Sequence, residues 1–208
     1  MKKLTKIFCE ASLAFLAFAF TSCADAIVND GSNVRSYVDS SNSGASGGVI
    51  PFSKFEGCDL QIWENTFTAT TTTEGLVITV GSVGWWGGAF VNNGAVGPTD
   101  SGVVTYDMSN VSKITFEAKI SAAGDIWIST SDSNSNAGAA RGKSFTLTTE
   151  WSESPYEFEI SEGTNKVSAN DYGVLAIGGG NSEGTTITLK NIAFYDASGN
   201  EIVPGVNN

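Results

Sequence analysis

A strict alternation of apolar and polar residues over residues 113–120 constrains the fold of this chain more than any other feature. A period of two over eight residues is the pattern of a β-strand with one buried and one solvated face. After a short Ser-Ala-Ala-Gly connection, residues 125–131 alternate again, with Ile126 and Ile128 on the buried face. Trp127 then falls on the polar face, where folding alone does not require an aromatic side chain.

Two arrangements of these neighbouring strands are open. If they form a hairpin, Lys119 faces Trp127 and Glu117 faces Ser129, so that one solvated face carries an indole beside charged groups. If the two strands belong to different sheets, as consecutive strands of jelly rolls often do, this pairing does not form.

The composition excludes several classes of function. A formal net charge of −11 repels phosphate, and the chain lacks the basic stripe of a nucleic-acid-binding protein. The sequence contains no histidine, which excludes Ser-His-Asp and Cys-His catalysis and the usual zinc sites. Its 24 glycines, together with many Thr, Ser and Asn residues, favour a β-protein with many turns.

Residues 1–22 are predicted to be a secretory signal peptide, because an apolar run over residues 13–20 follows a lysine-rich start. That run is far shorter than the roughly 20 residues that a transmembrane helix needs. Cys23 follows Phe-Thr-Ser, which resembles the bacterial lipobox, where the cysteine is lipidated and becomes the mature N-terminus. An ordinary signal peptide is the alternative. Cys58 is predicted to be a small buried hydrophobe, or to pair with Cys23 if no lipid is attached.

Residues 23–48 are rich in Asn, Ser and Gly, which predicts a flexible tether rather than a folded element. A single domain over residues 49–208 follows. Within it, about nine short strand candidates are separated by Gly, Asn and Ser turns, a spacing typical of a sandwich. The predicted fold class is therefore all-β: an antiparallel two-sheet jelly-roll β-sandwich after a signal peptide and a flexible tether.

The final predicted strand, residues 184–196 with the sequence GTTITLKNIAFYD, follows a Gly-rich segment, and a Trp-Gly cluster comes early in the domain. Over roughly residues 52–202 the chain thereby resembles carbohydrate-binding modules of the galactose-binding-like jelly-roll type. The resemblance implies a concave face that often binds glycans, and frequently a structural calcium ion linking the first and last strands. Glu56 and Asp196 are the calcium ligands it suggests, and two unrelated surface carboxylates are the alternative.

The densest aromatic cluster is Trp85-Trp86-Gly87-Gly88. Adjacent strand residues face opposite ways, so one tryptophan is expected in the core and one outward, and parity does not decide which. Flanking glycines let a ligand approach the backbone, and the flat C–H faces of sugars stack on indoles. Packing of both tryptophans into the core and a sheet rim is the alternative. The residues predicted to bind a glycan are Trp85, Trp86, Trp127, Glu117 and Lys119.

Trp63 and Trp151 lie near the ends of predicted strands and are interpreted as core residues. Catalysis is not predicted, because acids such as Glu157 and Glu159 fall on an outward face and no acid–base pair stands out. The sequence therefore predicts a lipid-anchored, extracytoplasmic protein of a bacterial membrane that binds a glycan or polysaccharide, and no nucleic acid. The alternative is a surface lipoprotein with a structural or protein-binding role. Exposure at the cell surface stays open.

Overall fold

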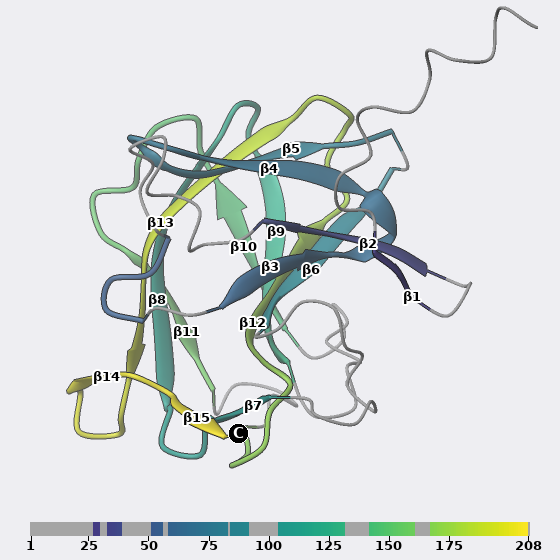
Figure 1. Cartoon of the computed structure of the whole chain (residues 1–208). Coiled ribbons are helices and arrows are strands. Elements are labelled where there is room, and N and C mark those ends of the chain that lie inside the picture. The colour runs from purple at the N-terminus through teal and green to yellow at the C-terminus, as the bar shows by residue number, and fades with distance from the viewer. Residues whose placement is uncertain are drawn as a thin grey trace, which may run out of the picture.

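In the computed structural model, the described residues are 27–29, 33–38, 51–55, 58–82, 84–91, 104–131, 142–160 and 167–207. For 27–29, 33–38, 59 and 131 the description covers the backbone alone. Two antiparallel sheets form a β-sandwich (Figure 1), which confirms the predicted all-β, two-sheet sandwich. In spatial order, the strands of the seven-stranded sheet are β1 (Ile27–Asn29), β2 (Asn33–Val38), β3 (Asp59–Ile62), β6 (Trp86–Val91), β12 (Gly173–Gly179), β9 (Gly124–Ser131) and β10 (Lys143–Leu147).

The second sheet covers the other side of the core. Its strands, in spatial order, are β11 (Tyr156–Glu159), β8 (Lys113–Ile120), β13 (Thr186–Tyr195), β5 (Gly75–Val80) and β4 (Phe67–Thr72), with β14 (Glu201–Ile202) paired to β13. A separate two-stranded sheet pairs β7 (Thr105–Asp107) with β15 (Gly205–Asn207).

The two alternating strands of the central sequence stretch lie in different sheets. β8 pairs with β11 and β13, whereas β9 pairs with β10 and β12. The hairpin that would set Lys119 opposite Trp127 and Glu117 opposite Ser129 is therefore wrong. The chain crosses from one sheet to the other between β8 and β9, so that both apolar faces point into the same core.

That core fills the space between the sheets. Phe116 of β8 meets Phe145 of β10 edge to face, with ring centroids 5.1 Å apart. Phe67 of β4 meets Trp86 of β6 in the same way at 5.5 Å. These aromatic contacts join one sheet to the other, and edge-to-face geometry is the arrangement that aromatic quadrupoles favour. Cys58 is buried at 3% exposure, as expected of a small hydrophobe.

The segment predicted as a tether contains two strands. β1 pairs with β2, and β2 extends the seven-stranded sheet by pairing with β3, with Tyr37 opposite Gln61. Val34, Tyr37 and Val38 have high β-propensity in an otherwise polar segment. This propensity favours the addition of β2 to the edge of the sheet at β3. The predicted signal peptide, Cys23 and residues 39–50 lie outside the described residues. Within the described part of the chain, no helix has the length and apolarity of a membrane span.

Candidate ligand-binding face

The outer face of the seven-stranded sheet carries a row of two glycines between two tryptophans. Gly178 of β12 lies opposite Gly87 of β6 on one side and opposite Trp127 of β9 on the other. The pairing of β3 with β6 brings Trp63, which follows β3, beside Gly87. Strand pairing thus aligns residues from four separate parts of the chain across the sheet.

Each glycine makes room for one indole. A Cβ atom on Gly87 would lie 2.8 Å from Trp63 Cε3, and one on Gly178 would lie 2.3 Å from Trp127 Cζ2. Real Cβ atoms essentially never come this close to another heavy atom. The sequence interpretation, in which glycines flanking Trp86 let a ligand approach the backbone, is therefore wrong for Gly87, whose open side is occupied by Trp63.

The two indoles form a pair with nearly parallel planes. The ring centroids of Trp63 and Trp127 are 6.1 Å apart and their planes differ by 26°. Both side chains are half-buried, and both pack on a small apolar cluster of the outer face, separate from the main core. The residues of that cluster are Ala89, Val91, Tyr172 and Ala176. Trp63 is therefore not a core residue, contrary to the sequence interpretation.

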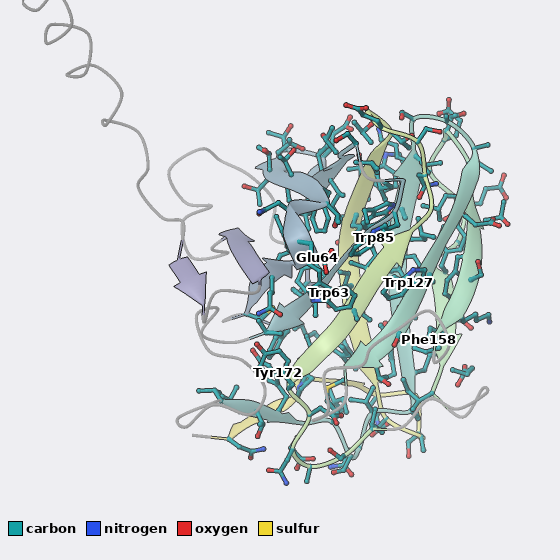
Figure 2. The ribbon with its side chains drawn as sticks, turned by 90° about the vertical axis from the view of Figure 1, so that its right-hand side faces the viewer. Trp63, Glu64, Trp85, Trp127, Phe158 and Tyr172 are labelled. Atoms are coloured by element: carbon teal, nitrogen blue, oxygen red, sulfur yellow. The ribbon has the colours of Figure 1, made fainter. Side chains whose placement is uncertain are left out.

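The adjacent tryptophans Trp85 and Trp86 point in opposite directions. Trp86 is fully buried in the main core, and its Nε1–H donates to Asn181 Oδ1 at 2.8 Å. Trp85 is 40% exposed, and two residues before Gly87 it has the parity of the outer face. Figure 2 labels Trp85 together with Trp63 and Trp127. The sequence predicts one inward and one outward side chain, and the structure agrees. Because Trp86 is buried, it is no longer a candidate ligand-binding residue.

Polar side chains flank the indoles on the same face. Asp125 precedes Trp127 by two residues, is exposed, and accepts a hydrogen bond from Thr146 Oγ1 at 2.6 Å. Gln61 Nε2 donates to the Tyr172 hydroxyl at 3.1 Å, and both of these side chains are buried. Asp125 and Thr146 are therefore the exposed hydrogen-bonding groups beside the aromatic surface, whereas Gln61 and Tyr172 bond to each other beneath it.

Glu117 and Lys119 lie on the outer face of the other sheet, so they do not join Trp127. Lys119 Nζ is 2.8 Å from Glu74 Oε2, and Lys190 Nζ is 3.2 Å from Glu117 Oε2. A hydrogen bond from the Asn191 side chain at 2.7 Å is the main reason that the pKa of Glu117 lies below its usual value. These charges form a network of their own.

Trp151 lies in that network and not in the core, contrary to the sequence interpretation. The Nζ atoms of Lys190 and Lys119 are 4.1 and 5.0 Å from the centroid of its ring. The indole is half-buried. Trp63 and Trp127 are half-buried too, but Trp151 lies on the opposite side of the sandwich.

The predicted calcium ligands are placed only in part. Asp196 lies in the turn between β13 and β14, where its carboxylate accepts hydrogen bonds from the backbone N–H groups of Ser198 and Asn200 and from the Asn200 side chain. The Asn200 side chain is the main reason that the pKa of Asp196 is lowered. Glu56 lies outside the described residues. Among the residues that the structure describes, no three His, Cys, Asp or Glu side chains gather as a metal site.

No protein-family model matches the sequence, and no curated protein matches it either. Among solved structures, the fold is similar to variants of a family 29 carbohydrate-binding module. One has 13% sequence identity and a TM-score of 0.45, with 65% of this chain and 79% of that chain covered. A second has 12% identity and a TM-score of 0.45, with 76% and 89% covered. A third, complexed with mannohexaose, has 14% identity and a TM-score of 0.44, with 66% and 79% covered. Likenesses this distant bear on no more than the fold.

Proposed function

We propose that this protein binds a glycan or polysaccharide on the outer face of the seven-stranded sheet, through Trp63, Trp127 and Trp85. The observation that carries the proposal is the indole pair seated on Gly87 and Gly178, with the exposed Trp85 two residues before Gly87 in the chain. If these rings were buried in the core, the glycines at positions 87 and 178 would not be needed to make room for them. The rings instead lie on the outer surface of the sheet, and ligand binding explains why they lie there.

The chemistry of this face suits sugars. A sugar ring presents flat C–H surface that packs on an indole, and its hydroxyls hydrogen-bond to carboxylates and amides at the margin. Asp125 and Thr146 supply such groups next to Trp127. Because Trp63 and Trp127 already pack on each other and on the sheet, little side-chain freedom is lost when a ligand arrives, which favours affinity.

The experiment is native electrophoresis of the full chain in gels that contain soluble neutral polysaccharides, with variants of matched chemistry. Trp127→Ala should lower the affinity for the polysaccharide about tenfold and reduce the retardation accordingly, since a sugar ring stacked on an indole contributes on the order of 1.4 kcal/mol. Trp151→Ala is the matched control, because this half-buried indole lies on the opposite sheet. Equal retardation of both variants, or a stronger effect of Trp151→Ala, would contradict the proposal.

The lipid anchor and the extracytoplasmic location are proposed with this function. They are supported by the apolar run over residues 13–20, by the lysine-rich start before it and by the lipobox-like residues that lead to Cys23. A protein held at a membrane by a lipid on Cys23 would present its glycan-binding face to polymers outside the membrane. A structural or protein-binding role remains the rival, and absence of retardation on every polysaccharide would favour it.

A further inference from the structure

Trp63 is held by a turn whose backbone is strained. The chain leaves β3 through the 3-10 turn η2 (Trp63–Asn65) and enters β4 in the other sheet. Within this turn Glu64 has φ 51° and Asn65 has φ 54°. Non-glycine residues rarely adopt this left-handed region, and two in succession persist only where surrounding contacts over-determine the conformation.

The contacts that hold the turn converge on Thr66, which is 1% exposed. Its backbone N–H and its hydroxyl both donate to the carbonyl oxygen of Trp63, at 3.0 and 2.9 Å. The same hydroxyl accepts a hydrogen bond from the backbone N–H of Gly87 at 3.1 Å. The Thr66 carbonyl accepts another from Gly81 N–H at 2.8 Å. One buried hydroxyl therefore links the backbone of Trp63 to β6.

Gly87 is also the residue on which the ring of Trp63 rests. A Cβ atom at Gly87 would lie 2.8 and 3.1 Å from Trp63 Cε3 and Cζ3. Trp63 therefore contacts Gly87 in two ways. Its carbonyl group is linked to the Gly87 N–H through the Thr66 hydroxyl, and its indole packs directly on Gly87. Gly87 in turn pairs with Gly178, which carries the ring of Trp127. The position of one indole relative to the other follows from this chain of contacts.

We propose that Thr66 is a positioning residue, whose hydroxyl holds Trp63 against Gly87 and so assembles the Trp63–Trp127 pair before a ligand binds. The effect on affinity rests on the proposed glycan-binding function, whereas the effect of Thr66 on the position of Trp63 does not. Without the hydroxyl, Gly87 N–H loses a buried acceptor and the left-handed turn loses one of its restraints. Trp63 then occupies the paired position only part of the time, and the apparent affinity falls by that fraction.

The test compares Thr66→Val, which keeps the shape of the side chain and removes the hydroxyl, with Thr66→Ser, which keeps the hydroxyl. Full-length protein is labelled with 5-fluorotryptophan, and its ¹⁹F NMR signals are assigned with single Trp→Phe variants. In Thr66→Val the Trp63 signal should broaden or shift and the Trp151 signal should not. Affinity for mannohexaose or cellohexaose, whichever the parent binds, should weaken about tenfold. Thr66→Ser should restore both readouts.

A purely structural role predicts something different. If Thr66→Val lowers the melting temperature but leaves the Trp63 signal and the affinity as in the parent, the positioning proposal is overturned. If the Trp63 signal changes as expected while Trp63→Ala leaves binding of both hexasaccharides unchanged, the positioning stands and the glycan-binding role of Trp63 falls. The two failures are therefore distinguishable in the same set of variants.

Discussion

Replacing Gly178 with alanine tests whether the glycine row is required for the indole pair. The added Cβ would lie 2.3 Å from Trp127 Cζ2 and 2.5 Å from the carbonyl oxygen of Trp86. The first contact displaces the ring and the second presses on the backbone of the neighbouring strand, so relief by one side-chain rotation is not available. Overpacking of this kind costs about 1–3 kcal/mol. At about 2–4 °C per kcal/mol for a chain of this size, the melting temperature should fall by about 2–12 °C.

Gly180→Ala is the matched control, because a Cβ at Gly180 meets no heavy atom within 4 Å and the backbone there needs no glycine. Urea unfolding should show a lower free energy of unfolding for Gly178→Ala than for Gly180→Ala, by most of the overpacking cost given above. The reason is that exposed substitutions such as Gly180→Ala usually change stability by less than about 0.5 kcal/mol. Gly178→Ala should also lose glycan retardation, which Gly180→Ala should keep. If the two variants are equally stable and equally retarded, Trp127 does not depend on the gap at Gly178 and the account of the row is wrong.

Three further outcomes are expected. Cys23→Ser should move the protein from the membrane fraction to the soluble fraction, and unchanged membrane association would rule out the lipid anchor. Excess chelator should lower the melting temperature if Glu56 and Asp196 share a calcium ion, because a ligand that binds only the folded state stabilises it; an unchanged melting curve would dispose of that site. Burial raises the pKa of Asp171 above its ordinary value of 3.8, so the unfolded chain ionises first and this group lowers stability as the pH rises from about 3.8 through the folded pKa. Relative to the parent, Asp171→Asn should gain stability as the pH rises through that interval, and a pH-independent difference would argue against the shift.

Local alternation predicted the strands of the core well, because burial of one strand face is written in the sequence with a period of two. Ile114, Phe116, Ala118 and Ile120 all lie inward at 0–1% exposure, as the pattern of β8 indicates. The same reasoning placed one of Trp85 and Trp86 inward and the other outward, as the structure has them. These results need no knowledge of which strands are neighbours.

The order of strands in a sheet cannot be predicted from local sequence patterns, and the wrong predictions about the binding site follow from that. The pairing of Lys119 with Trp127 assumed that consecutive strands are neighbours, whereas β8 and β9 lie in opposite sheets. Trp63 and Trp127 meet only because β3, β6, β12 and β9 are adjacent in space. A signal was nevertheless present: glycines inside strands indicate close approach of another group, and Gly87 and Gly178 are the positions where the indoles approach.

The most direct measurement is a titration of ¹⁵N-labelled full-length protein with mannohexaose or cellohexaose, followed through the indole N–H resonances of its tryptophans. If the sugar binds on the outer face of the seven-stranded sheet, the signals of Trp63, Trp85 and Trp127 should shift together as it is added. The signals of Trp86, buried in the core, and Trp151, on the opposite sheet, should stay in place. Shifts confined to Trp151, or a sugar that binds without moving Trp63 and Trp127, would contradict the proposed binding face.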